Sequence, residues 1–372
     1  MKGTPVIPPV YLTATYHFEK SDDLIDVVQN RSGYIYSRWD NPTIVEVENT
    51  LADLEGYQRS LGFSSGMAAI TTTILALVSA GDRIVSTREI YGGTFEFLNE
   101  VLPNFQVETE FVHCWETERI IEEIQKGLSL LYLESPTNPL LRIVELQPLI
   151  VEAHRHGAVV MLDSTFASPI NQKPAKMGVD IVVHSATKYL GGHHDLTAGL
   201  ICGHQQQVEK IWYLRKILGG VMDPMSAFLT ARGLKTLELR VHKQNQNALQ
   251  IARFLQDHEK VNTVNYPGLE SHPDYEIARR QMSGFGGMLS FDLKASFEQT
   301  KVFLDSLREI KLATSLGGVT SLATQPITNT HVGLSAEDRA KAGVSESLVR
   351  LSVGVEDIKL LIQDLEQALA FV

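Results

Sequence analysis

Short runs of branched apolar residues alternate with segments of helical period through the first two hundred residues of the chain. The runs lie at residues 83–87, 128–135, 158–164 and 180–185. Between them lie segments such as IIEEIQKGL and LQPLIVEAHRHG, in which apolar residues recur every three or four positions. This alternation predicts βαβ units, that is, an α/β fold with a mostly parallel sheet covered by helices on both faces.

The pattern changes at about residue 223. A long helical pattern over residues 225–258 leads into shorter strand patterns and amphipathic helices, which predicts a smaller α+β domain joined through a helix. The first forty residues are rich in proline and lack a helical period, so we expect them to form an extended arm that lies on another surface. The predicted division is an arm at 1–40, a large domain at 41–240 and a small C-terminal domain at 241–372.

Composition narrows the class of protein. The chain has 372 residues, 44% of them hydrophobic, which is enough for a large core. A formal net charge of −11 argues against binding to nucleic acid or to an anionic membrane, because phosphate would repel such a chain. No apolar run reaches the length of a membrane helix, and the start MKGTPVIPPVYL lacks the features of a signal peptide. With only Cys114 and Cys202, we expect a reduced, cytoplasmic protein.

Polar residues follow the apolar runs, at the edge of a parallel sheet where ligands bind. The segment GFSSGM opens a long apolar helix whose free N-terminal amides could bind an anion, and Gly66 would allow a phosphate to approach closely. An ordinary Ser/Gly helix cap explains this segment equally well. Asn138 lies on the proline-bounded loop after residues 128–135, where it is either a ligand contact or a turn asparagine.

Two charged residues follow the next two runs. Asp163 ends the run AVVMLD, where a buried carboxylate is costly unless a cation meets it; helix capping is the alternative. Lys188 comes after DIVVHSAT, where burial would lower the pKa of the amine and make it nucleophilic. A solvated loop lysine fits poorly, because its neighbours are apolar or small. An anion pocket, an acid for a ring nitrogen and an imine-forming lysine are together the groups that pyridoxal 5′-phosphate requires. Ser185 and Thr187 flank the lysine and suit contacts to the phosphate.

The chain resembles the Cys/Met-metabolism family of pyridoxal-phosphate enzymes, which contains cystathionine γ-synthase, cystathionine γ-lyase, methionine γ-lyase and O-acetylhomoserine sulfhydrylase. The resemblance implies the aminotransferase-like fold called fold type I. It runs nearly end to end and rests on these motifs: PPVYLTATY, YIYSRWDNPT, FSSGMAAI, YGGT, ESPTNP, MLDSTFASP, HSATKYLGGHHDLTAG, RGLKTLELR, YPGLESHP, SGFGGMLSF, SLGGVTSLATQP and LVRLSVGVED.

The resemblance implies a role for each matching residue. Lys188 would bind the cofactor as an imine and move protons, Asp163 would pair with the pyridinium, and Tyr91 would stack on the ring and assist proton transfer. Other positions would contact the cofactor or the substrate. The phosphate would be held by the amides of Gly66 and Met67 with Ser185 and Thr187, the phenolic oxygen would lie beside Asn138, and the substrate carboxylate would be bound by Arg350 next to Ser315.

Tyr36 and Arg38 carry an implication for assembly. In the family this pair reaches the phosphate bound by a neighbouring subunit, so the resemblance implies a homodimer with shared sites, built into a homotetramer. The alternative is an aromatic and basic pair on a turn before the sequence NPT.

Three positions depart from the family pattern and bear on the substrate. Glu96 stands where cystathionine-binding members generally carry an arginine, and Thr314 where they tend to have a glutamate; both changes count against cystathionine. Gly93 stands where methionine γ-lyases often have a cysteine. We therefore expect γ-elimination from a methionine-like or O-substituted homoserine substrate. The alternative for Glu96 is an exposed helix residue with no role in substrate choice.

Other functions stay open at this point. The same residues could serve γ-replacement or β-elimination, and a binding protein that has lost catalysis would be an alternative class. The pairs His193–His194 and His154–His156 do not converge on one ion, so we expect no catalytic metal.

Overall fold

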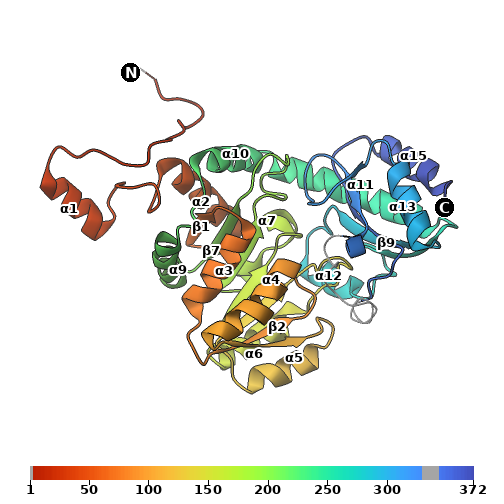
Figure 1. Ribbon diagram of the computed structural model, residues 1–372, viewed down its shortest axis with the longest axis horizontal. Coiled ribbons are helices and arrows are strands. Elements are labelled where there is room, and N and C mark those ends of the chain that lie inside the picture. The colour runs from red at the N-terminus through yellow and green to blue at the C-terminus, as the bar shows by residue number, and fades with distance from the viewer. Residues whose placement is uncertain (1–2, 329–342) are drawn as a thin grey trace.

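The computed structural model describes residues 3–328 and 343–372, and two β-sheets organise these parts of the chain (Figure 1). The large sheet has seven described strands in the order β1-β7-β6-β5-β4-β2-β3. Its strands are β1 Arg59–Phe63, β2 Arg83–Thr87, β3 Glu108–Val112, β4 Leu130–Glu134, β5 Val159–Asp163, β6 Ile181–Ser185 and β7 Gly199–Gly203. Strands β3, β2, β4, β5 and β6 pair in parallel, and β7 pairs antiparallel with both β6 and β1.

Helices cover both faces of this sheet because the central strands are apolar on both sides. In β4, Leu130 and Tyr132 belong to one core cluster, and Leu131 and Leu133 belong to another. The helices of this part of the chain are α2 Pro42–Glu55, α3 Gly66–Leu77, α4 Gly92–Glu96, α5 Thr117–Gln125, α6 Leu146–Arg155, α7 Ser168–Asn171, α8 Pro174–Met177 and α9 Gln205–Leu218. The four apolar runs are β2, β4, β5 and β6, so the predicted α/β fold with a mostly parallel sheet is confirmed.

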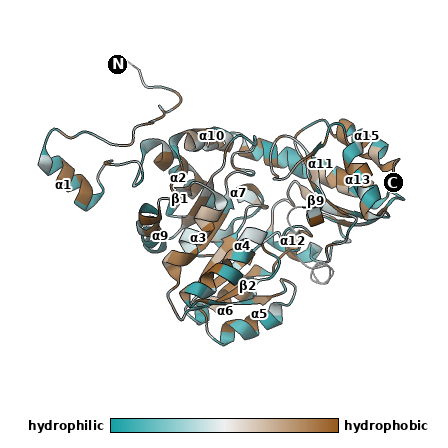
Figure 2. Cartoon of the chain, viewed as in Figure 1, coloured by the Kyte–Doolittle hydropathy of each residue, from teal (hydrophilic) through white to brown (hydrophobic). Residues whose placement is uncertain are grey.

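A second sheet, in the order β10-β11-β12-β9-β8, forms the C-terminal part with its own apolar core. Its elements are β8 Val261–Asn265, α12 Tyr275–Gln281, β9 Met288–Leu293, α13 Phe297–Ser306, β10 Lys311–Leu312, β11 Leu322–Thr324, β12 Leu348–Ser352 and α15 Ile358–Leu369. Figure 2 shows hydrophobic residues concentrated on the strands and on the sides of the helices that face them.

The helical pattern over residues 225–258 is two helices, not one. Helix α10 Pro224–Leu234 ends before α11 Leu237–Gln256 begins. The Gly233 carbonyl accepts hydrogen bonds from Thr236 N at 3.2 Å and from Arg240 Nη2 at 2.8 Å, so a tight turn and a side chain satisfy the end of α10. Helix α11 continues into the second sheet's core, and the predicted boundary at residue 241 falls inside it.

The N-terminal arm contains a helix that the sequence reasoning missed. Helix α1 Ser21–Asn30 has no buried residue, and Leu24, Ile25 and Val28 are 40–50% exposed. It projects away from the two sheets (Figure 1), and Figure 2 shows hydrophobic and hydrophilic residues mixed along it. The sequence of α1 has the period of an amphipathic helix. The acidic side chains in its first turn interact favourably with the helix dipole. The prediction of an arm without helical period was therefore wrong.

Among the described residues, no helix is long and apolar enough to cross a membrane.

Candidate active site

The last residues of three neighbouring strands form the floor of the candidate site. Glu134 ends β4, Asp163 ends β5 and Ser185 ends β6. Glu134 and Asp163 are partners in the register of the parallel β4–β5 pair. Lys188 follows in a turn closed by a hydrogen bond from its backbone N to Ser185 O, at 3.1 Å. The chain thus brings the predicted lysine and aspartate to the same edge of the sheet, as the rule for parallel strands requires.

The Lys188 amine is held in a largely buried, electropositive environment. Its Nζ donates a hydrogen bond to Ser315 Oγ at 3.2 Å. Burial lowers the pKa of Lys188, and the positive charge of Arg350 adds to this effect while Asp163 opposes it. A lysine with a lowered pKa is more often neutral near pH 7, and only the neutral amine can act as a nucleophile or accept a proton.

Arg350 lies on β12, where it is 4% exposed. Its Nη1 donates to Asn138 Oδ1 at 3.0 Å, and its Nη2 donates to the Ser315 carbonyl at 3.2 Å. Burial lowers the pKa of Arg350 to about 10. No carboxylate in the described residues forms an ion pair with it, although a buried guanidinium is costly without an anion. Its surroundings fit a carboxylate supplied by a ligand.

Ser315 connects the lysine and the arginine. Its backbone has φ 76°, a left-handed conformation that costs energy for a residue other than glycine. The hydroxyl accepts from Lys188 while the carbonyl accepts from Arg350. In this conformation, Ser315 directs its hydroxyl to Lys188 and its carbonyl to Arg350.

The N-terminus of α3 packs closely against the end of β6 because its first residue is glycine. A Cβ added to Gly66 would lie 2.9 Å from Ser185 Cβ and 3.0 Å from Ser185 Oγ, too close for any side chain. Ser65 caps the helix, accepting from Ala68 N at 3.0 Å, and other amides of the first turn lack intrahelical acceptors. Backbone amides next to a serine hydroxyl can donate hydrogen bonds to a phosphate group.

The Thr187 hydroxyl makes two bonds to the backbone of Ala198. It donates to Ala198 O at 3.3 Å and accepts from Ala198 N at 3.0 Å. A phosphate oxygen accepts hydrogen bonds, so the predicted contact would require the Thr187 hydroxyl to donate to the phosphate in place of the Ala198 carbonyl.

Asp163 is buried without an ion-pair partner in the described residues. Burial raises the pKa of its carboxyl, and hydrogen bonding to Thr165 opposes this; Thr165 N donates to Oδ1 at 2.9 Å. A buried acid without an ion-pair partner fits a protonated ring nitrogen.

The Tyr91 ring lies beside Met67 of α3. A Cβ placed on Gly93 would lie 2.9 Å from Tyr91 Cε1 and 3.3 Å from Met67 Sδ, so the ring covers Gly93. Charge interaction with Tyr91 opposes the lowering of the Arg350 pKa by burial. The Tyr91 side chain is 47% exposed.

Glu134 is a residue of this site that the sequence reasoning missed. It is 4% exposed, and its Oε2 accepts from the backbone N of Tyr91 at 2.7 Å. Burial and the neighbouring Asp163 raise the pKa of Glu134 well above its usual value. The position at the end of β4, matching that of Asp163 at the end of β5, was the signal that could have found it.

We expect Glu134→Leu to weaken the binding of the cofactor about three- to tenfold, because one hydrogen bond to the Tyr91 backbone is lost. Glu134→Gln should bind nearly as well as the unchanged protein, since its amide oxygen can accept from the same N–H. Titration of the apoprotein with pyridoxal 5′-phosphate measures both. Equal affinities for the leucine and glutamine variants would contradict a positioning role.

Four predicted residues lie outside this group in the single chain. Arg38 Nη1 donates to the Lys216 carbonyl on α9, and its guanidinium lies 5.4 Å from the Tyr36 ring centroid. Tyr36 and Arg38 are both exposed. Glu96, at the end of α4, and Thr314 are exposed as well. No group of three or more His, Cys, Asp or Glu is placed to hold a metal ion within residues 3–328 and 343–372.

The site joins a largely buried lysine of lowered pKa to a glycine and a serine at a helix N-terminus. It also contains a buried aspartate and a buried arginine, neither of which has an ion-pair partner among the described residues. An amino-acid-transforming enzyme that uses pyridoxal 5′-phosphate requires these groups. The comparisons agree. The family model of Cys/Met metabolism PLP-dependent enzymes matches residues 2–370, and the chain belongs to this family. It is a pyridoxal-phosphate-dependent lyase or transferase of cysteine and methionine metabolism with the fold-type-I architecture.

Similar proteins carry different activities in their names. The L-methionine γ-lyase of Fusobacterium nucleatum is 44% identical over 365 residues, covering 97% of this chain and 92% of its own. The chloroplastic cystathionine γ-synthase 1 of Arabidopsis thaliana is 43% identical over 368 residues, covering 98% and 65%. The crystal structure of cystathionine γ-synthase from Xanthomonas oryzae pv. oryzae, in complex with aminoacrylate and cysteine, superposes with a TM-score of 0.94 at 36% identity, covering 98% and 93%.

Proposed function

We propose that the protein catalyses γ-elimination from a methionine-like or O-substituted homoserine substrate, releasing a 2-oxo acid, ammonia and the leaving group. The observation that carries this proposal is the arrangement of Lys188 Nζ, 3.2 Å from Ser315 Oγ, with the buried, unpaired Arg350 bound to the carbonyl of the same serine. An α-amino acid whose carboxylate binds Arg350 would present its Cα to the lysine.

Each residue would have a definite task. Arg350 would bind the substrate carboxylate with two parallel hydrogen bonds, a geometry that guanidinium favours. Asn138, which already accepts from Arg350, would fix the orientation of that guanidinium. Lys188 would remove the proton from Cα. Bound pyridoxal phosphate, with Asp163 facing its ring nitrogen, would supply the electron sink that makes this proton acidic.

The leaving group departs from Cγ only after a second proton is lost, from Cβ. Lys188 and the Tyr91 phenol would take and return these protons. The bond from Cγ to sulfur or oxygen then breaks, and its electron pair leaves with that atom. Addition of water completes the balance, giving 2-oxobutanoate and ammonia.

Two exposed residues bear on the choice of substrate. Glu96 would repel a distal carboxylate such as that of cystathionine, and it would tolerate an uncharged thioether or favour a cationic distal group. Thr314, next to Ser315, provides no charge for a distal ammonium. The methionine γ-lyase relative supports elimination. The cystathionine γ-synthase relatives favour a second candidate, γ-replacement, in which a thiol attacks Cγ; β-elimination is a further alternative.

A substrate panel separates these activities. Release of 2-oxobutanoate is measured with methionine, cystathionine, O-acetylhomoserine, O-succinylhomoserine and canavanine, each with and without a thiol. We expect methionine or an O-substituted homoserine to give the highest kcat/KM, and the 2-oxo acid to form without added thiol. Cystathionine as the best substrate would contradict the argument from Glu96 and Thr314, and product formation only in the presence of a thiol would favour replacement.

The assembly is part of the proposal. We propose that Tyr36 and Arg38, which are both exposed in the single chain, bind the cofactor phosphate of a neighbouring subunit. The protein would then be a homodimer with shared sites, and a homotetramer of two such dimers. The division into an arm at 1–40 and domains at 41–240 and 241–372, and a cytoplasmic location, belong to the same proposal.

A further inference from the structure

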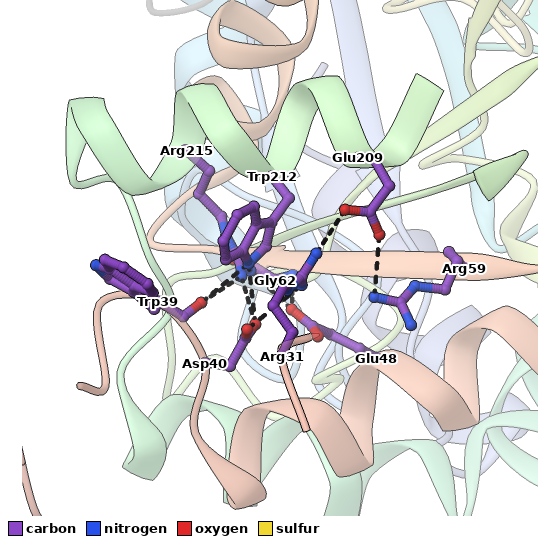
Figure 3. Close-up of polar contacts among 9 residues, drawn as sticks. All are labelled: Arg31, Trp39, Asp40, Glu48, Arg59, Gly62, Glu209, Trp212 and Arg215. Carbon is purple, nitrogen blue, oxygen red and sulfur yellow. Dashed lines mark hydrogen bonds and ion pairs between the residues drawn. The ribbon is translucent and has the colours of Figure 1, made fainter. Parts of the chain in front are cut away.

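The segment of residues 31–40, called here the presenting loop, joins α1 to α2 and carries Tyr36 and Arg38. Both ends of this loop contact α9 through a cluster of charged and aromatic side chains (Figure 3). The cluster lies between α2 and α9, and it brings together residues from the arm, β1 and both helices. The site described above uses none of these side chains, so their function is unassigned.

Arg215 secures the last residues of the loop. It is fully buried on α9, and its Nη1 donates to Glu48 Oε1 at 2.7 Å and to Gly62 O at 2.8 Å. Its Nη2 donates to the Trp39 carbonyl at 3.1 Å. A buried guanidinium needs its hydrogen bonds satisfied, so displacement of Trp39 would leave part of this charge unpaired.

Arg31 secures the first residue of the loop. Its Nη1 donates to Glu209 Oε2 on α9 at 2.5 Å, and its Nη2 lies 3.4 Å from Asp40 Oδ2. The guanidinium also lies over the Trp212 ring, 3.6 Å from the centroid. Trp212 Nε1 in turn donates to Asp40 Oδ1 at 3.1 Å. Arg31 therefore connects the start of the loop to its end and to α9.

Tyr36 and Arg38 are the exposed residues of the central part of this loop. Tyr36 is 43% exposed and Arg38 is exposed, while the charged contacts at both ends of the loop are partly or fully buried. Lys216 of α9 adds to the anchoring, with Nζ 4.2 Å from the Trp39 ring centroid and its carbonyl bound to Arg38. A loop fixed at its ends gives up less conformational entropy when its outer side chains bind a ligand.

We propose that Arg31 and Arg215 are positioning residues, which hold the presenting loop so that Tyr36 and Arg38 can bind the cofactor phosphate in a second copy of the chain. This inference rests on the shared site proposed above. Affinity for the cofactor would then depend on contacts between the presenting loop and α9 of one chain. These contacts touch neither the cofactor nor the substrate.

Arg31→Met is the variant that tests this inference, and Arg59→Met is its matched control. Both arginines pair with Glu209, at 2.5 Å and 3.6 Å respectively, but Arg59 lies on β1 and forms no ion pair with the presenting loop among the described residues. The measured quantity is the dissociation constant of pyridoxal 5′-phosphate for the full-length apoprotein, with the oligomeric state measured in parallel. We expect about a tenfold weaker affinity for Arg31→Met and no change for Arg59→Met.

A double variant separates positioning from general structural damage. Arg38→Ala alone should weaken binding at least as much as Arg31→Met, and Arg31→Met should cause little further loss once Arg38 is absent, because it acts through that side chain. If Arg38→Ala weakens binding but Arg31→Met does not, or if the two losses simply multiply, the positioning role is wrong and the shared site stands. If Arg38→Ala has no effect, the shared site fails and the inference fails with it.

Discussion

Arg350→Lys is expected to lower kcat/KM for the amino-acid substrate about 30-fold, equivalent to about 2 kcal/mol, and to do so mainly through a higher KM. Lysine keeps the positive charge but cannot donate two parallel hydrogen bonds to a carboxylate. It would also leave Asn138 Oδ1 or the Ser315 carbonyl, which now accept from Arg350, without a donor. Steady-state kinetics of 2-oxobutanoate release measure the change.

The control for this prediction is a substrate analogue whose carboxylate is replaced by a neutral amide. The unchanged protein and Arg350→Lys should process the analogue at similar, low rates, because the bidentate contact is absent in both cases. An equal loss on both substrates would show that Arg350 acts on the architecture of the site and not on the carboxylate.

Lys188→Ala is expected to lower kcat by about three orders of magnitude or more, since the base for the Cα proton is removed. The cofactor should still bind, with lower affinity, because the Gly66 and Ser185 cradle and Asp163 are unchanged. Turnover before and after addition of a small primary amine measures the effect. Partial recovery with the amine would support the proton-transfer role, while retention of full activity without it would contradict that role.

Sequence patterns predicted the central sheet well because its strands are buried on both faces. The continuous apolar runs of β2, β4, β5 and β6 have no other simple explanation. Strands β1 and β7, RSLGF and GLICG, escaped prediction because they contain glycine, and their antiparallel pairing depends on residues far apart in sequence. Helix α1 was missed although its sequence has a helical period, because the prolines before it led the whole arm to be taken as extended.

The candidate site could be predicted as far as it follows from strand ends and known motifs. Asp163 ends a buried strand, Lys188 and Asn138 follow buried strands within four residues, and Arg350 was implied only by the resemblance. The contacts of the presenting loop could not be predicted, since Arg215 and Glu48 are separated by 167 positions and meet only in the fold. Glu134 could be predicted only in part. The sequence shows that it ends a strand, but it does not show the hydrogen bond from the Tyr91 backbone.

Reduction of the holoenzyme with borohydride, followed by peptide mapping, tests most directly the claim that Lys188 carries the cofactor. We expect one phosphopyridoxyl group per chain, attached to the peptide that contains Lys188, and none in the Lys188→Ala variant. A label on a different lysine, or no label on a protein that is yellow and active, would contradict the account.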